Sequence, residues 1–280
     1  MPFGPLISPE VLSASRPAIR LLDARPGAEA YAAGHLEGAL HADLNRCLST
    51  ASDPGFDPSR GGRHPLPSPS AWAARLGSWG IGPDTPVVAY DDASGGNGAC
   101  RLWWMLKAFG HAGVAVLDGG LAAAAAAGIA VTGDVPEAPP ALPPYPCGRW
   151  GLPTVDIGTV ERQLKDPARK VLDVRSRERW RGEAEPIDPA AGRLPGTVNL
   201  PYTENLEADG RYKTPAALRE MYLRLLDGTP ADHLTVHCGS GVTACHTLLA
   251  LELAGLPGAS LYVGSYSEWC RSGKPLGKGA

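Results

Sequence analysis

Short apolar runs alternate along the chain with segments of helical periodicity. The run 234–236, Leu-Thr-Val, has the composition of a buried strand. The stretch 244–253 places its apolar residues at helical spacing and predicts a helix. Between the two, Cys238 opens a short loop that contains two glycines. The chain is therefore expected to pass from strand to helix through a tight turn that begins at this cysteine.

The same order of segments occurs twice. The corresponding pairs are 21–25 and 171–175, 33–39 and 191–197, 86–91 and 234–238, and 116–120 and 261–265. Alternating strands and helices within each half favour a parallel sheet covered by helices on both faces. A duplicated α/β domain is the simplest account of the repeat.

The composition between the halves suggests a domain boundary. Residues 133–153 are rich in Pro, Ala and Gly, which favours an extended, semi-rigid connector. We therefore expect one domain at 1–132, a linker at 133–153 and a second domain at 154–280. The Gly- and Lys-rich residues 272–280 are expected to be frayed.

Composition narrows the function. A net charge of −3 gives no reason to expect nucleic acid or an anionic membrane as a partner. No apolar run is long enough to span a bilayer, and the N-terminus lacks the basic and apolar regions of a signal peptide. The six cysteines show no metal-ligand spacing. We expect a cytoplasmic protein with reduced thiols and without a metal or organic cofactor.

Cys238 is the candidate nucleophile. Backbone N–H groups that converge at a helix N-terminus favour a thiolate and stabilise a bound anion. Gly239 and Gly241 allow the loop to curl, and Ser240 and Thr243 supply hydroxyl groups. The loop carries no charged side chain, so these groups and the backbone are expected to bind the anion. The alternatives are a core cysteine and a serine that only caps the helix.

The loop 238–243, Cys-Gly-Ser-Gly-Val-Thr, resembles the active loop of the rhodanese superfamily of sulfurtransferases. Its uncharged wording is similar to the 3-mercaptopyruvate sulfurtransferase branch, whereas the thiosulfate branch carries a charged loop such as CRKGVT. The resemblance implies two tandem rhodanese-like domains. It also implies that sulfur moves from a small donor, through a Cys238 persulfide, to cyanide or a thiol such as thioredoxin or glutathione.

The resemblance extends to the donor site and to the first half. Gly239, Gly241, Val242 and Thr243 would form the loop that binds the donor. Tandem rhodaneses resemble this chain in pairing an inactive N-terminal domain with an active C-terminal one. Here, Asp91 stands in the first half where Cys238 stands in the second, and an aspartate cannot perform thiolate chemistry.

Arg179 is the first candidate for binding a donor carboxylate. It matches the arginine of the family's Arg-Tyr/Phe-x-Gly stretch, and a guanidinium offers two parallel hydrogen bonds. The alternative is a solvated helix face; Arg177 and Arg181 are weaker candidates. Arg175 has a twin, Arg25, which favours a structural ion pair with an acid.

One family arginine is missing. Relatives in the 3-mercaptopyruvate branch often continue with Glu-Pro-Arg, whose arginine is a second carboxylate contact. Here, Ile187 follows Glu185 and Pro186. Arg193 could substitute for it in part.

Asp43 and His64 fall where the 3-mercaptopyruvate branch has an aspartate and a histidine that face the active loop. With Ser240 they would resemble a serine–histidine–aspartate relay, in which the histidine moves a proton and the aspartate orients it. The alternative is an ordinary loop histidine and a strand-end aspartate.

Three other functions compete with a 3-mercaptopyruvate sulfurtransferase. The first is a thiosulfate sulfurtransferase. The second is a persulfide carrier or regulatory binding module without turnover, which would bind partners without Cys238. The third is a phosphatase of the same fold, which needs an arginine six positions after the cysteine; Ala244 stands there.

Overall fold

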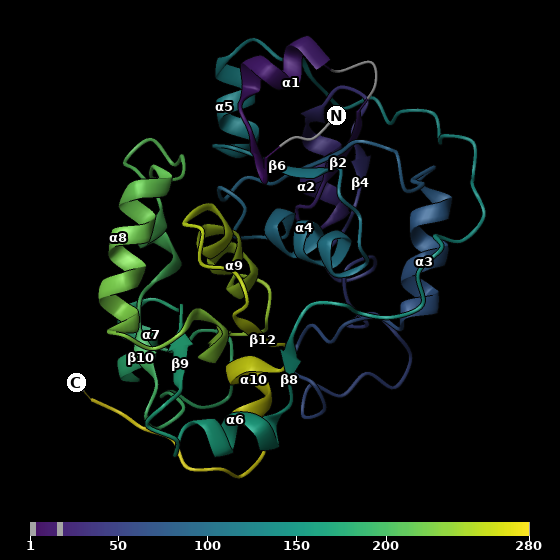
Figure 1. Cartoon of the computed structure of the whole chain (residues 1–280). Helices are drawn as coiled ribbons and strands as arrows, with labels where there is room; N and C mark the ends of the chain where they lie inside the picture. Colours follow the sequence, from purple (N-terminus) through teal and green to yellow (C-terminus); the bar gives the residue numbers. More distant parts are fainter. Residues whose placement is uncertain (1–3, 16–18, 280) are drawn as a thin grey trace. The chain divides into compact units, whose positions relative to one another are not determined.

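The computed structural model describes residues 4–15 and 19–279 (Figure 1). The chain divides into two compact units. Unit 1 comprises residues 1–50, 66–151 and 208–211, and unit 2 comprises residues 51–65, 152–207 and 212–280. The segment 51–65, which belongs to the first half of the sequence, is thus part of unit 2.

Unit 1 is built on a five-stranded parallel sheet with the order β1-β6-β5-β2-β4. Its strands are β1 (Leu6–Ile7), β2 (Arg20–Asp23), β4 (Leu40–His41), β5 (Val87–Tyr90) and β6 (Val114–Leu117). Its helices are α1 (Pro9–Ser15), α2 (Ala28–Ala33), α3 (Pro69–Ser78), α4 (Ala99–Ala108) and α5 (Gly120–Ala126). A short antiparallel pair joins β3 (His35–Leu36) to β7 (Val131–Thr132).

Unit 2 contains a second five-stranded parallel sheet with the order β10-β9-β11-β12-β8. Its strands are β8 (Thr154–Val155), β9 (Lys170–Asp173), β10 (Val198–Asn199), β11 (Leu234–His237) and β12 (Ser260–Tyr262). The α-helices are α6 (Ile157–Gln163), α7 (Arg177–Arg181), α8 (Pro215–Leu226), α9 (Ala244–Leu253) and α10 (Ser265–Trp269). The turns η2 (Tyr202–Asn205) and η3 (Ala231–His233) are 3-10 helices.

The two sheets have the same topology, because β8, β12, β11, β9 and β10 take the places of β1, β6, β5, β2 and β4. The predicted fold of two α/β domains with parallel sheets is confirmed. In each sheet the middle strand, β5 or β11, is buried along its whole length, as expected when helices cover both faces. Strand β5 is followed directly by Asp91, and strand β11 is followed directly by Cys238.

The connector and the C-terminal residues are both ordered by backbone hydrogen bonds. Residues 142, 145 and 151 donate their N–H groups to the carbonyls of residues 77, 73 and 108, all in unit 1. The prediction that 272–280 is frayed is wrong for the described part: Gly277 exchanges two hydrogen bonds with Arg193, and Gly279 N–H donates to Arg181 O. Pairing of these backbone groups holds the segment in place.

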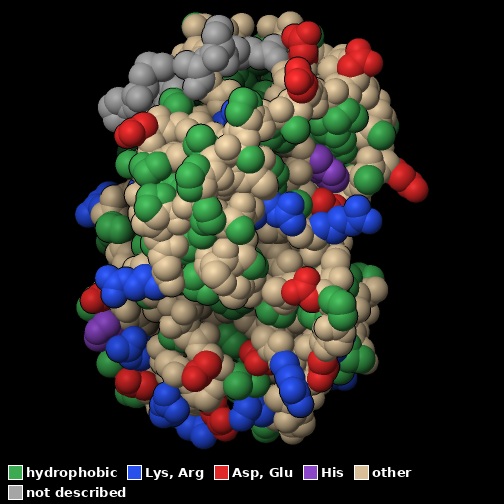
Figure 2. All heavy atoms as spheres, turned by 90° about the vertical axis from the view of Figure 1, so that its right-hand side faces the viewer, with side chains coloured by type: hydrophobic (Ala, Val, Ile, Leu, Met, Phe, Trp, Pro, Cys, Tyr) green, Lys and Arg blue, Asp and Glu red, His purple; other side chains and the backbone are tan. Residues whose placement is uncertain are grey.

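Basic and acidic side chains are interspersed on the face drawn in Figure 2, with no continuous patch of one sign on that face. Within residues 4–15 and 19–279, no helix is both long and apolar enough to cross a membrane.

Candidate active site

Cys238 follows the middle strand β11, at the carboxyl edge of the unit 2 sheet. Ligands of open parallel sheets bind at this edge. The Cys238 residue is 3% exposed, and its sulfur lies 3.5 Å from the N–H nitrogen of Ser240, which donates to it. The loop 238–243 then enters α9, whose first turn is buried. The predicted strand–cysteine–loop–helix sequence is thus present.

The segment that begins α10 holds the first residues of this loop. Tyr266 N–H donates to Cys238 O at 3.1 Å, and Ser267 N–H donates to Gly239 O at 2.9 Å. Ser265 Oγ accepts from Cys238 N–H at 3.3 Å. The backbone N–H and C=O of Cys238 are therefore both held by hydrogen bonds, which favours a single geometry of the thiol.

Gly241 is the residue at which the loop requires glycine. Its φ of +73° lies in the left-handed region, and a Cβ on it would overlap the backbone carbonyl oxygen of Val263. Gly239 has no such φ; it is small for a different reason, described below. Val242 is buried and Thr243 half-buried at the entry to α9.

Ser240 and His64 are brought together, with His64 Nδ1 2.8 Å from Ser240 Oγ. Ser240 is 6% exposed. His64 lies in the segment 51–65, which packs on the start of α10: Gly61 N–H donates to Glu268 Oε1 at 3.0 Å, and Arg63 N–H donates to Ser267 Oγ at 2.9 Å. The predicted proton-transfer pair therefore meets within unit 2.

Asp43, the third residue of the predicted relay, lies in unit 1. Its carboxylate accepts the N–H groups of Gly27, Asn45 and Arg46 at 2.7 to 2.9 Å. These hydrogen bonds give Asp43 a role in shaping the loop after β4.

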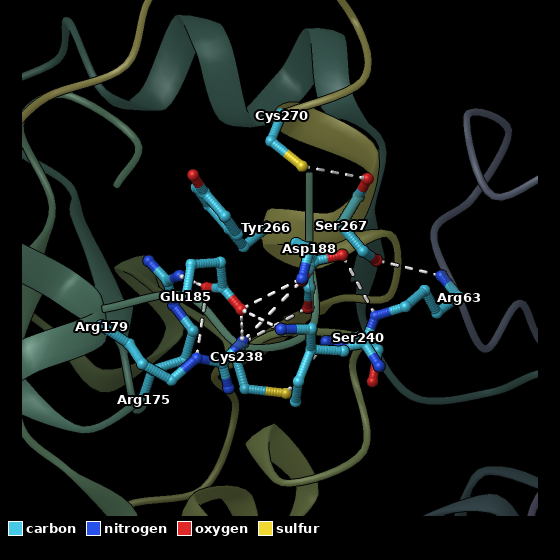
Figure 3. Close-up of polar contacts among 12 residues, drawn as sticks. Arg63, Arg175, Arg179, Glu185, Asp188, Cys238, Ser240, Tyr266, Ser267 and Cys270 are labelled. Atoms are coloured by element: carbon cyan, nitrogen blue, oxygen red, sulfur yellow. Dashed lines mark hydrogen bonds and ion pairs between the residues drawn. The ribbon is translucent and has the colours of Figure 1, made fainter. Parts of the chain in front are cut away.

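Arg179 lies beside the active loop. Its Nη2 donates to Glu185 Oε1 at 2.7 Å and its Nε donates to Glu185 Oε2 at 3.2 Å. A Cβ placed on Gly239 would lie 3.5 Å and 3.7 Å from the Nη2 and Nη1 atoms of Arg179. The predicted donor-binding arginine thus lies next to the residue that follows the nucleophile. Figure 3 shows Arg179 with Glu185.

Arg63 is a charged neighbour of the loop that the sequence did not point to. The same Cβ on Gly239 would lie 2.9 Å from Arg63 Nη2. Arg63 Nε donates to Asp188 Oδ1 at 3.2 Å. Two guanidinium groups therefore lie next to Gly239, in addition to the backbone and hydroxyl groups that were expected to bind the anion. The sequence offered one signal for Arg63, which is that it directly precedes the predicted relay residue His64.

Two buried acids hold the arginines of the site (Figure 3). Glu185 also binds Arg175, and Asp188 also accepts from Arg271 Nη1 at 2.7 Å. Burial alone raises the pKa of Glu185, but the hydrogen bond and charge of Arg179 outweigh it and hold the pKa below its ordinary value. Glu185 thus stays ionised and keeps the guanidinium groups in place.

Arg175 forms the structural ion pair that its twin predicted. It donates to Asp173 Oδ2 at 2.8 Å and to Gly192 O at 2.8 Å. In unit 1, Arg25 makes the same contacts with Asp23 and with a glycine carbonyl. A contact present in both units belongs to the fold.

The remaining candidates have other partners. Arg177 pairs with Glu204 at 2.9 Å and Arg181 lies 3.9 Å from Glu183. Arg193 stacks on Trp180 and donates to Gly279 O. Cys245 is fully buried, with Sγ 3.4 Å from Gly241 O, in agreement with packing.

Asp91 occupies the loop of unit 1 in a different way. Its carboxylate accepts backbone N–H groups at 2.7 to 3.0 Å from four loop residues and from the first residue of α4; they are Ala93, Gly95, Asn97, Gly98 and Ala99. Asp91 is fully buried. The loop before α4 is therefore an anion cradle that the chain's own carboxylate fills.

No cluster of three or more His, Cys, Asp or Glu side chains in residues 4–15 and 19–279 is arranged to hold a metal ion.

Comparison with known proteins places these features in a family. A family model described as Rhodanese-like domain matches residues 9–127 and 156–272. The chain is 43% identical over 280 residues to a probable 3-mercaptopyruvate sulfurtransferase of Pseudomonas aeruginosa, with 96% of each chain covered. It is 34% identical over 271 residues to a thiosulfate sulfurtransferase of Bos taurus, covering 92% of this chain and 87% of the other.

A solved structure agrees. The 3-mercaptopyruvate sulfurtransferase from Leishmania major superposes with a TM-score of 0.82 at 28% identity, covering 96% of this chain and 75% of the other. Two of these relatives are named for 3-mercaptopyruvate as sulfur donor and one is named for thiosulfate.

Proposed function

Because the chain belongs to the rhodanese-like family, we propose that it is a sulfurtransferase that moves sulfur from 3-mercaptopyruvate to an acceptor through a persulfide on Cys238. The observation that carries the proposal is a hydrogen bond to His64 from Ser240, which stands two residues after the cysteine. A proton relay at this place suits a donor whose carbon must be protonated after sulfur leaves. The family name, the P. aeruginosa relative and the L. major structure support the same function.

The chemistry proceeds in two steps. The Cys238 thiolate attacks the sulfur of the donor; an S–S bond forms, the C–S bond breaks, and the electron pair leaves as the enolate of pyruvate. The enolate takes one proton at carbon, which Ser240 delivers with His64 as its partner. An acceptor thiol or cyanide then takes the outer sulfur and restores the Cys238 thiolate.

The charges beside the loop suit an anionic donor. We assign the donor carboxylate to Arg179, and the loop residues Gly239, Gly241, Val242 and Thr243 to the walls around the transferred sulfur. Four arginines face three carboxylates in this network, which leaves one positive charge; they are Arg63, Arg175, Arg179 and Arg271, with Asp173, Glu185 and Asp188. One carboxylate would neutralise the network.

We place the nucleophile and its loop in the second domain, 154–280, with His64 supplied by the segment 51–65, and we assign no sulfur transfer to the loop of the first domain, 1–132, because Asp91 fills it. Asp43 remains the predicted third member of the relay. The acceptor is cyanide or a thiol such as thioredoxin or glutathione, and the place of action is the cytoplasm.

The test combines turnover with intact-protein mass. Wild-type protein incubated with 3-mercaptopyruvate should gain one sulfur atom and should produce thiocyanate when cyanide is added. Cys238→Ser should do neither, whereas Cys245→Ser, which alters a buried packing thiol, should do both. Sulfur transfer by Cys238→Ser would refute the proposal.

A thiosulfate sulfurtransferase is the second candidate, favoured by the two guanidinium groups beside Gly239 and by the Bos taurus relative. The ratio of kcat/KM for the two donors, with cyanide as common acceptor, decides between them. A large preference for thiosulfate would overturn the assignment of 3-mercaptopyruvate.

A further inference from the structure

We propose that Arg63 is a second binding residue for the anionic group of the sulfur donor and that it determines donor affinity together with Arg179. This inference rests on the proposed function. Arg63 joins His64 as a second side chain that the segment 51–65 contributes to a site otherwise built from residues of 152–280, and no arginine follows Glu185 and Pro186 in this chain.

The terminal nitrogens of Arg63 are available to a ligand. Its side chain makes one hydrogen bond, from Nε to Asp188 Oδ1, so within the described ranges neither Nη1 nor Nη2 has a protein acceptor. Arg179 Nη1 likewise lacks an acceptor among the described residues, because its bonds use Nε and Nη2. These unpaired donors lie next to Gly239, directly after the nucleophile.

The Arg63 side chain is also fixed. Asp188, whose side chain is fully buried, binds it through Nε, and the Arg63 backbone is tied to Ser267 Oγ. Binding the guanidinium at Nε leaves its outer fork directed elsewhere, and in Figure 3 Arg63 and Arg179 extend toward the loop from opposite sides of the view. A fixed, unpaired fork loses little entropy when it binds an anion.

Gly239 provides the space that Arg63 uses. A Cβ at residue 239 would lie 2.9 Å from Arg63 Nη2, closer than real Cβ contacts, so any side chain there must displace the guanidinium. A positive charge from another segment thus lies beside a loop that carries no charged side chain of its own.

The experiment compares Arg63→Met with Arg60→Met, steady-state kinetics being measured with 3-mercaptopyruvate and cyanide. Arg60 is a matched control: it lies in the same segment, is 89% exposed and pairs only loosely with Asp57. Loss of a charge-assisted contact should raise KM for the donor about 10- to 100-fold in Arg63→Met, with kcat within threefold. Arg60→Met should leave KM within twofold.

Two further variants keep the proposal falsifiable. Arg63→Lys retains the charge without the fork and should give an intermediate KM. Gly239→Ala, which pushes Arg63 aside without an unfavourable φ, should raise KM in the same direction. Unchanged KM values in Arg63→Met and Gly239→Ala would overturn the inference.

Binding without turnover separates this inference from the proposed function. In the Cys238→Ser background, 3-mercaptopyruvate should bind about 10- to 100-fold more weakly when Arg63 is also replaced by Met. Equal affinities, with wild-type sulfur transfer intact, would refute the role of Arg63 alone. A wild-type protein that neither binds 3-mercaptopyruvate nor transfers sulfur would refute both.

Discussion

Gly241→Ala is the substitution for which the structure predicts the sharpest loss. Gly241 has a φ of +73° and lies against Val263, so alanine brings both a strained backbone and a steric overlap. The left-handed conformation alone costs about 1–2 kcal/mol for a residue with a Cβ. The new Cβ must also move until it is at least 3.0 Å from the Val263 carbonyl oxygen, and the loop must move with it.

These terms translate into two measurements. A cost of about 1–2 kcal/mol in a unit of this size lowers the thermal midpoint by roughly 2–8 °C. A shift of about 1 Å in a reacting group costs about 100-fold in rate, and this loop must move by somewhat less, so kcat/KM for sulfur transfer should fall by about 10- to 100-fold. Calorimetry and the thiocyanate assay report the two effects separately.

Gly228→Ala is the matched control. Gly228 is exposed, has a φ of +81° and has open space around its Cβ position, so alanine there has the backbone cost without the overlap. It should lower the midpoint by a similar or smaller amount and leave kcat/KM within twofold. Wild-type activity in Gly241→Ala would refute the argument that this loop fixes the nucleophile.

Three other predictions concern contacts within unit 1 or within unit 2. His64→Gln should lower kcat with 3-mercaptopyruvate by about 100-fold, because Ser240 loses its proton partner; a rate within threefold of wild type in the same assay would exclude the relay. Burial raises the pKa of Glu185 but Arg179 holds it below 4.5, so its stabilising contribution is present above that value and is lost as the pH falls below it. Glu185→Gln should therefore flatten the midpoint-against-pH curve on the acid side, and an unchanged slope there would contradict this account. Asp91→Ala should destabilise unit 1 by about 3 kcal/mol or more, because five backbone N–H groups lose their acceptor, and added formate should restore part of the midpoint; a wild-type midpoint would show that the loop holds without the carboxylate.

Most of the fold could be predicted from the repeat in the sequence. Matching segments predicted a duplicated α/β domain with parallel sheets, and the twin arginines Arg25 and Arg175 predicted an ion pair that recurs in both units. Both inferences rest on local pattern, which a single sequence displays. The strand-end cysteine and its loop were visible for the same reason.

Long-range pairings were not visible. Arg63 reaches Gly239 and Asp188 across more than a hundred residues, and no periodicity encodes such a contact. The C-terminal residues were predicted to be frayed from their composition, yet Gly277 pairs with Arg193 in the middle of the second half. Composition indicates whether a segment would be ordered in isolation. The C-terminal residues are instead ordered by hydrogen bonds to a residue distant in the sequence.

Because residues 51–65 belong to unit 2, the second half of the sequence does not contain the whole site. A fragment that begins at residue 152 would retain Cys238 and its loop but would lack Arg63 and His64, which arrive from the other copy. The two copies are thus no longer independent modules. The nucleophile comes from one half of the sequence and these two side chains come from the other, so the site is complete only when both halves are present.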